Sequence, residues 1–144
     1  MNSNSENPKV GRLFEELTRR LLKDYFHADF DLNVPIAIGD PPKNHRFDCV
    51  SNDRKIVAEC KRYTWTGTGN IPSAKMGFLN QAVFYLTYLP EQTTKIVVMN
   101  KSTHPKRSET LMEYYYRTNR HLLKGITLFE VDEAIGSIRV IQMG

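Results

Sequence analysis

The sequence predicts a single α/β domain, in which a mixed β-sheet is flanked by helices. Three observations lead to this fold class. Apolar residues recur at helical spacing in three separate segments of the chain. Two short apolar runs flank the turn-forming stretch SNDR, which is typical of an antiparallel hairpin. The run KIVVMN is apolar without alternation, which indicates a strand covered on both faces.

The first predicted elements are a helix and a strand. Asn7 and Pro8 are the residue types expected of a helix cap followed by proline at the first helical position. Apolar residues at helical spacing then predict a helix through about Tyr25. Residues 33–38 predict a short strand, and Pro35 places that strand at a sheet edge or at a bulge. The segment PPKN after this strand predicts a turn.

A hairpin is predicted next, and the rest of the chain alternates helices with strands. Ser73 is expected to cap a second helix, which ends before Pro90. A third helix is expected to be closed by Gly125 in the left-handed conformation. The predicted elements after the first strand are hairpin strands 46–51 and 55–63, helix 73–89, strand 95–100, helix 108–123, and strands 126–131 and 137–141. The predicted order is αβββαβαβ, followed by one closing strand.

Length and composition suit one domain over residues 1–144, with residues 1–7 as a flexible polar tail. We expect no membrane association, because no apolar run approaches the roughly 18 residues of a membrane-spanning helix. The N-terminal residues also lack the features of a secretory signal. Cys49 and Cys60 are too few for a disulfide framework, so a cytoplasmic location is expected. The two thiols can instead face each other across the hairpin as small buried hydrophobes.

Three charged residues lie inside the predicted hairpin, where charges are costly to bury. Side chains alternate across a strand, so Glu59 and Lys61 share one face while Cys60 lies on the other. The preceding strand carries Asp48, and directly opposed residues have Cβ atoms about 5 Å apart. We therefore expect Asp48 and Glu59 to reach one cation, with the backbone carbonyl of Cys60 as a further ligand.

This donor set suits a hard divalent cation. Mg²⁺ prefers oxygen ligands and binds through one or two carboxylates, leaving positions for water and phosphate oxygens. Two close carboxylates repel each other, and a cation removes that penalty. The cation would acidify a water and neutralise charge on a phosphate, while Lys61 would hold the water or stabilise the phosphorus centre. The pattern therefore predicts a hydrolytic site.

The motif also has a plainer interpretation. The triplet at 53–55 fits the same [D/E]-x-K pattern, although it belongs to a solvated turn. For Asp48, Glu59 and Lys61 the alternative is an ion cluster on an exposed sheet face, which contributes about 0–1 kcal/mol per pair. The site is favoured because only the triplet at 59–61 ends an apolar strand and follows an aspartate one strand earlier.

This succession of elements resembles the PD-(D/E)xK nuclease superfamily over most of the chain. A helix with an acid precedes a strand ending in FD, a hairpin, V-A-E-C-K and a second helix. G-R-L-F-E is similar to the G-x-x-F-E opening of Mrr-like restriction enzymes and archaeal Holliday-junction resolvases. The resemblance assigns the motif acids to Asp48 and Glu59, the motif lysine to Lys61 and a helical acid to Glu15. Phe47 stands where the family motif has proline.

The resemblance implies a restriction-endonuclease-like αβββαβ core. It also implies a Mg²⁺-dependent DNA endonuclease, with Mn²⁺ as a substitute, acting in restriction, repair or recombination. A homodimer is implied because paired cuts need paired sites. One alternative is a catalytically weak, nuclease-like module for DNA binding or assembly, against which the intact motif argues. Another is a purely structural domain.

Two adjacent acids compete for the helical position. Glu15 and Glu16 can each be the charged flank of an amphipathic helix. We favour Glu15, because Gly11 lies one turn earlier and would allow a close approach.

Four residues after the motif are candidates for DNA contacts. Gln81 and Tyr85 lie four apart on the second helix and so share a face, as in the accessory motif of exonuclease-type members. Arg62 and Trp65 lead into the flexible loop TGTGN. The ring of Trp65 can stack on a base there, or it can cap the core.

A basic loop supplies two more candidates. Lys106 and Arg107 lie in NKSTHPKRS, which can contact phosphates or be a solvated loop. The net charge of +4 is compatible with a nucleic-acid partner but does not by itself indicate one. No histidine falls at a predicted strand end of the site, so no histidine is assigned a role.

Overall fold

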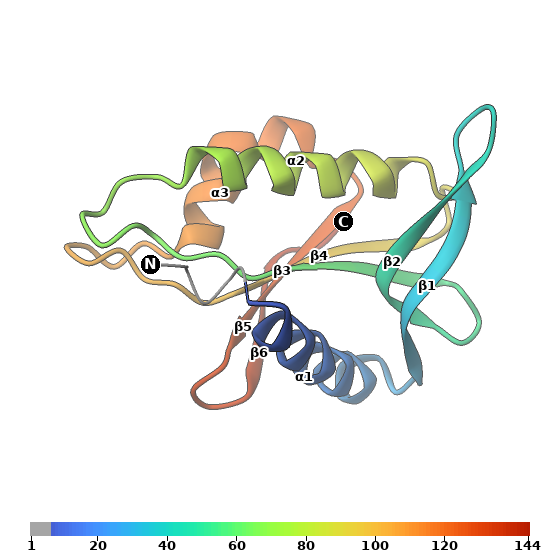
Figure 1. Ribbon diagram of the computed structural model, residues 1–144, viewed down its shortest axis with the longest axis horizontal. Coiled ribbons are helices and arrows are strands. Elements are labelled where there is room, and N and C mark those ends of the chain that lie inside the picture. The colour runs from blue at the N-terminus through green and yellow to red at the C-terminus, as the bar shows by residue number, and fades with distance from the viewer. Residues whose placement is uncertain (1–6) are drawn as a thin grey trace.

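The computed structural model describes residues 7–144, so the tail predicted for residues 1–7 lies outside the described residues except for Asn7. Within the described part, three α-helices, one 3₁₀ helix and six strands form the domain (Figure 1). In chain order they are α1 (Pro8–Phe26), β1 (Phe30–Ile38), β2 (Lys43–Ser51), β3 (Ile56–Lys61), α2 (Ser73–Thr87), β4 (Thr94–Asn100), α3 (Leu111–Asn119), the 3₁₀ helix η2 (Arg120–Leu122), β5 (Ile126–Asp132) and β6 (Ser137–Gln142). None of the helices in residues 7–144 has the length and apolarity that crossing a membrane requires.

The strands form one mixed sheet in the order β1-β2-β3-β4-β5-β6. The outer pairs β1–β2, β2–β3 and β5–β6 are antiparallel, and the central pairs β3–β4 and β4–β5 are parallel. Short turns join the antiparallel neighbours, whereas α2 and α3 provide the crossovers that parallel strands need. The predicted α/β class and the mixed sheet flanked by helices are therefore confirmed.

Helices cover both faces of the sheet. Figure 1 shows α1 below the sheet and α2 and α3 above it. Each of these helices has buried apolar residues. The α1-side core consists of Phe14, Leu22, Phe30, Cys49, Ala58, Cys60, Ile96, Val98, Phe129 and Val131. The α2-side core is larger and consists of Phe47, Val50, Val57, Tyr63, Trp65, Leu79, Val83, Leu86, Leu89, Val97, Met99, Leu111, Met112, Tyr115, Leu123, Ile126 and Leu128. Every residue of β4 from 96 to 100 is buried, as its apolar run predicts.

The first half of the chain has the expected elements with different strand bounds: β1 and β2 each begin three residues earlier than predicted, and β3 ends at Lys61 instead of residue 63. The side chain of Asn7 caps α1, because its Oδ1 accepts a hydrogen bond from the backbone N–H of Lys9 at 2.9 Å. Pro35 lies on β1, which is an edge strand, so the missing N–H removes no hydrogen bond between strands on the open side. The expected turn is shorter than PPKN, because Lys43 and Asn44 already pair in β2.

Two helix starts differ from the expectations. Ser73 is the first residue of α2 and not its cap, and Pro72 precedes it without a side-chain cap. The third helix starts at Leu111 instead of residue 108. Thr110 and Glu113 form a reciprocal capping box there, which satisfies two backbone N–H groups and fixes the later start.

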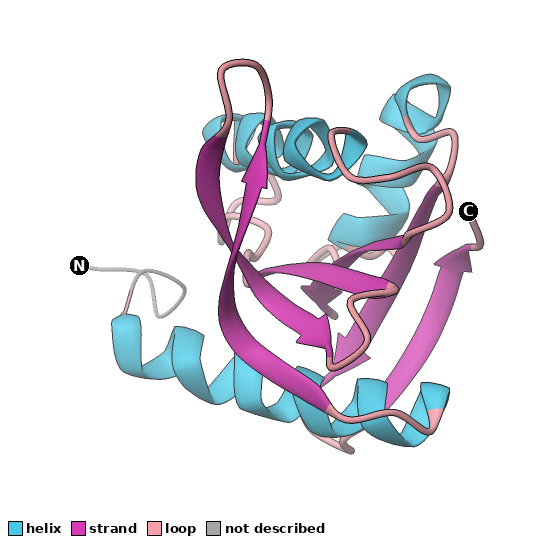
Figure 2. Ribbon diagram, turned by 90° about the vertical axis from the view of Figure 1, so that its right-hand side faces the viewer, coloured by secondary structure: helices cyan, strands magenta, loops and turns pink. Residues whose placement is uncertain are grey.

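The ribbon formed by β1 and β2 twists away from the plane of the other strands (Figures 1 and 2). Near its base, Leu32 and its partner Cys49 pack in the α1-side core. One pair further, Val34 and its partner Phe47 pack in the α2-side core. Residues two apart in a strand normally share a face, so the ribbon must rotate between these pairs. Asn33 lies at the rotation, with a positive φ of 58°.

Candidate active site

The candidate site lies where β2 separates from β3. The two strands pair only at Cys49–Ala58 and Val50–Val57, and one further step of this register opposes Asp48 to Glu59. Beyond that step the strands diverge. The backbone N–H of Cys60 donates a hydrogen bond to Oδ2 of Asp48 at 2.8 Å. The carboxylate of Asp48 thus accepts the hydrogen bond that a backbone carbonyl would accept in a regular sheet. This bond holds Asp48 beside β3 beyond the last backbone pair of the two strands.

Glu59 is the buried acid of the site. Only 3% of its surface is exposed, and it shares a face of β3 with Lys61. Burial raises the pKa of Glu59 to about 8, and the negative charge of Asp48 adds to the effect. Without a cation, Glu59 therefore keeps its proton through neutral pH.

Glu15 on α1 faces the same place from the other layer. It is half-buried beside Phe14, and its backbone carbonyl lies 4.0 Å from the thiol of Cys49 on β2. Burial, with a contribution from the charge of Asp48, raises the pKa of Glu15 to about 7. The neighbouring Glu16 is exposed. The structure thus brings Glu15, and not Glu16, toward Asp48.

The expectation that Gly11 allows α1 to approach the sheet closely is wrong. A Cβ added at Gly11 would meet no atom within 4 Å among the described residues, so Gly11 permits no special approach of α1 to the sheet. Glu15 reaches the site because it flanks the buried stripe that includes Phe14 and Thr18.

Lys61 ends β3 within electrostatic reach of all three acids. Its positive charge lowers the pKa values of Glu15, Asp48 and Glu59, although burial outweighs it in each case. The pKa of Asp48 is raised by burial despite the hydrogen bond from Cys60. The side chain of Lys61 is half-buried, and no residue of the described chain forms a hydrogen bond or ion pair with its ammonium group. Three acids and one lysine therefore act on one another without being locked into ion pairs.

His45 belongs to this environment, contrary to the expectation that no histidine does. Its Nε2 lies 3.4 Å from Oε1 of Glu59. Its ring stacks on Tyr85 at 4.0 Å and meets the edge of Phe47 at 4.6 Å. Burial lowers the pKa of His45, which favours the neutral imidazole. Extending the β2–β3 register opposes residue 45 to residue 62, so only the rotation of the ribbon brings His45 back to Glu59.

The donors fit a hard cation in kind, since all are carboxylate or carbonyl oxygens. Burial is the main reason that the pKa values of Glu15, Asp48 and Glu59 are raised, so ionising these acids is costly, and a bound cation would offset that cost. Within residues 7–144, however, no three side chains of the His, Cys, Asp and Glu types are gathered closely enough to hold a metal ion by themselves. The smallest matching donor set is that of the sequence analysis: Asp48, Glu59 and the carbonyl of Cys60.

Of the residues expected to contact DNA near α2, Gln81 is exposed and Tyr85 half-buried, whereas Trp65 is buried and Arg62 is engaged by another side chain. Gln81 and Tyr85 do share a face of α2, and the amide of Gln81 lies 3.5 Å from the hydroxyl of Tyr85. Trp65 is only 6% exposed and packs against Tyr114 and other rings, so the core-capping alternative describes it. Arg62 forms two hydrogen bonds, at 3.0 and 3.2 Å, with the carboxylate of Glu133.

The basic loop after β4 is exposed but partly engaged. The guanidinium of Arg107 lies 5.4 Å from the ring centre of Trp65 and 3.2 Å from Glu109. Lys106 is exposed, and its backbone N–H donates to the ring of His104. Of the two, Lys106 is the side chain more available to a phosphate.

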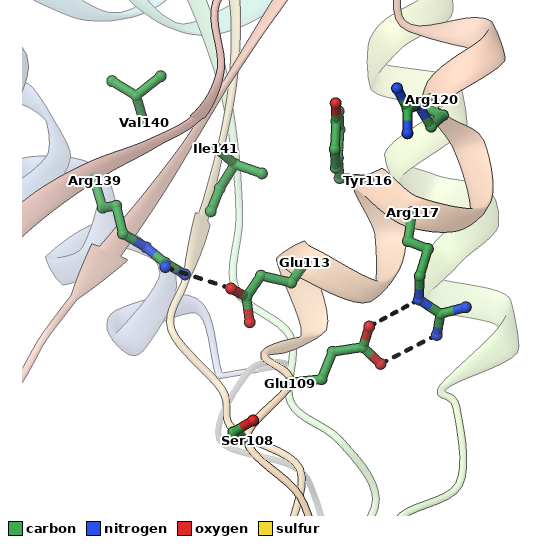
Figure 3. Close-up of a pocket in the computed structure, with 9 residues that line it drawn as sticks. All are labelled: Ser108, Glu109, Glu113, Tyr116, Arg117, Arg120, Arg139, Val140 and Ile141. Atoms are coloured by element: carbon green, nitrogen blue, oxygen red, sulfur yellow. Dashed lines mark hydrogen bonds and ion pairs between the residues drawn. The ribbon is translucent and has the colours of Figure 1, made fainter.

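A hollow of about 610 Å³ lies elsewhere, between α3 and β6. Its charges largely neutralise one another: Arg117 donates two hydrogen bonds to Glu109, and Arg139 pairs with Glu113 (Figure 3). None of the candidate site residues lines it. The chemistry therefore points to the β2–β3 junction and not to this larger hollow.

Comparisons of the chain with family models, with curated proteins and with solved structures find no match. A functional conclusion therefore depends on the residues and their geometry.

Proposed function

We propose that this chain is a Mg²⁺-dependent DNA endonuclease, for which Mn²⁺ can substitute. One observation carries the proposal: Asp48, held beside β3 by Cys60 N–H, and Glu59, Glu15 and Lys61 come from three elements and act electrostatically on one another near the point where β2 leaves β3. Keeping acids buried and close together is costly, so such an arrangement is typical of functional sites. A surface ion cluster, the plainer interpretation, does not account for a glutamate that is only 3% exposed and that, among the described residues, has His45 as its one basic ion-pair partner.

Asp48 and Glu59 would hold the cation, with the carbonyl of Cys60 as a third ligand. Asp48 already has one oxygen engaged by Cys60 N–H, which orients the carboxylate and leaves Oδ1 for a ligand. When bound, the cation supplies charge neutralisation at a phosphate and acidifies water. Because a ligand must be deprotonated, loading the site requires Glu59 to release its proton.

The other residues act through charge and position. The ammonium of Lys61 would stabilise the negative charge that develops on a phosphate oxygen during hydrolysis. Glu15, with a pKa of about 7, can accept or return a proton near neutral pH. The imidazole of His45 would hold the carboxylate of Glu59 in place.

The order of elements supports the proposed family. The succession α1-β1-β2-β3-α2-β4 has the αβββαβ order of a restriction-endonuclease-like core. A homodimer would supply two such sites for a paired cut, and the mass of the protein in solution tests that part of the proposal.

The alternative is a nuclease-like module that binds DNA or assembles with other chains without efficient cleavage. One observation favours it: within the described residues, no three His, Cys, Asp or Glu side chains lie close enough to one another to hold a metal ion. The two functions differ in whether the site takes up a cation and in whether DNA is cut.

The test is a cleavage assay with Mg²⁺ and with Mn²⁺ on plasmid, linear duplex, single-stranded and branched DNA. We expect Asp48→Asn and Glu59→Gln to lose at least about a hundred-fold in rate, because each removes a ligand charge. Glu16→Gln is the matched control, since it changes an exposed glutamate beside Glu15, and it should cleave like the wild-type chain.

Calorimetric titration of the same proteins with Mg²⁺ separates the alternatives. The absence of cation binding even at millimolar metal, with or without DNA, would support the module. Cleavage that persists in Glu59→Gln, or the absence of both binding and cleavage with either cation, would remove the nuclease proposal.

A further inference from the structure

A groove lies between the outer half of the β1–β2 ribbon and the end of α2. Figure 1 shows the tip of this ribbon rising beside the end of α2. The groove has a volume of about 340 Å³, within the range of small-ligand sites. Its lining residues are Ile38, Gly39, Lys43, Asn44, His45, Phe84, Tyr85 and Tyr88.

Two aromatic side chains of the groove are unusually open to solvent. Phe84 is 59% exposed and Tyr88 is 50% exposed, although both are large and apolar. They lie four residues apart at the end of α2, and their rings meet edge to face at 5.2 Å. Because the two rings touch, they form a contiguous apolar surface, and contiguous apolar surface is a feature of binding sites.

The charge of the groove matches a phosphate-bearing ligand. Among the described residues that line it, Lys43 is the only one with a full charge at neutral pH, and none is acidic. Asn44 and the hydroxyl groups of Tyr85 and Tyr88 add hydrogen-bonding groups. Exposed aromatic rings beside a cation are the combination that binds unstacked nucleic-acid bases together with their backbone.

The groove is continuous with the candidate active site. Tyr85 lines the groove and stacks on His45, and His45 lies 3.4 Å from Glu59. A strand whose base rests on Phe84 or Tyr88 would therefore run past His45 toward the acids.

We propose that this groove binds an unpaired base of DNA, so that the protein acts on DNA containing a single-stranded segment. This inference rests on the proposed function, because it takes Glu59 as part of the reacting centre. Stacking on Phe84 and Tyr88 supplies sequence-tolerant affinity, and Lys43 contacts the adjoining phosphate. A duplex, whose bases are already stacked, gains nothing from these rings.

The experiment measures binding without cleavage, in EDTA, by fluorescence anisotropy of labelled single-stranded and blunt duplex DNA. Phe84→Ala and Tyr88→Ala should each weaken binding of the single strand about ten-fold and leave duplex binding within about two-fold. Phe78→Ala is the matched control, because Phe78 lies on α2, is 46% exposed and does not line the groove. It should change neither affinity.

A strand containing 2-aminopurine reports stacking directly. Its emission should be quenched by the wild-type protein and by Phe78→Ala, and much less by Phe84→Ala. Lys43→Gln, at an exposed position that no core residue depends on, provides a variant whose folding is not in question. It should weaken single-strand binding and reduce its salt dependence.

Several results would overturn the inference. Equal losses in Phe78→Ala and Phe84→Ala, equal binding of single strand and duplex, or a change of oligomeric mass in Phe84→Ala with unchanged DNA binding would each do so. The last result would assign the groove to a second copy of the chain. Tight single-strand binding without cleavage would support the base-binding groove and refute the nuclease proposal. Mg²⁺-dependent cleavage without a preference for single strands would support the nuclease proposal and refute the base-binding groove.

Discussion

Replacing Glu59 by glutamine tests the buried acid without opening a cavity. Glutamine has nearly the same shape and can still hydrogen-bond to His45, but it cannot ionise. Alanine would confuse the result, because a residue that is 3% exposed leaves a void when it is truncated. We expect Glu59→Gln to stabilise the metal-free protein, and to do so more strongly as the pH rises.

The magnitude follows from the pKa of Glu59. Its value is about 8 in the folded chain against an ordinary 4.5, so the folded state keeps a proton that the unfolded state has lost between these values. Stability therefore falls as the pH rises through this window. The penalty is about 1 kcal/mol near pH 5.5 and about 4–5 kcal/mol near pH 8.5. Glutamine carries no such penalty, so its advantage should grow by about 3 kcal/mol between these conditions.

The assay is urea unfolding of both proteins in EDTA at the two pH values, followed by circular dichroism. A difference of about 3 kcal/mol corresponds to about 10 °C in melting temperature for a chain of this size. Glu16→Gln changes an exposed glutamate and should follow the wild-type chain at both pH values. If the wild-type and Glu59→Gln stabilities change in parallel with pH, Glu59 is not buried against Asp48 and the site is misassigned.

Three further predictions concern the cation, the lysine and the fold. Mg²⁺ binding near pH 7 should release close to one proton, because Glu59 must ionise, and the Mg²⁺ affinity should rise toward pH 8.5. Titration calorimetry in two buffers of different ionisation enthalpy measures the proton release, and the same binding heat in both buffers would contradict it. Lys61→Met should reduce cleavage at least about a hundred-fold while Mg²⁺ affinity stays equal or rises, since a positive charge near the acids is removed; weaker Mg²⁺ binding would show a different role. Thr110→Ala should destabilise the chain by about 1 kcal/mol without affecting Mg²⁺ binding, because it breaks the capping box of α3, and an unchanged unfolding midpoint would refute that role.

The sequence alone determined the order of the elements and the presence of the hairpin, but not the register of its strands. Periodicity and turn residues gave the helices, the strands and the mixed sheet, because these signals act between neighbours in the chain. Strand alternation put Glu59 and Lys61 on one face, whereas the structure supplied the β2–β3 register, which opposes Asp48 to Glu59 when it is continued one step beyond its last pair. The predicted helix starts were wrong at two positions. The cap of α2 is Pro72 and not Ser73, and α3 starts after Thr110 instead of at residue 108.

Tertiary structure decided what surrounds those residues. The rotation of the β1–β2 ribbon near Asn33 brings His45 to Glu59, which no sequence period encodes. The packing of α1 against the sheet half-buries Glu15 and leaves Glu16 exposed. Core packing buries Trp65, for which the sequence allowed either base stacking or a place in the core. The physical reason is the same in each case: burial and electrostatic proximity depend on how distant segments pack, whereas spacing in the chain constrains only local conformation and face.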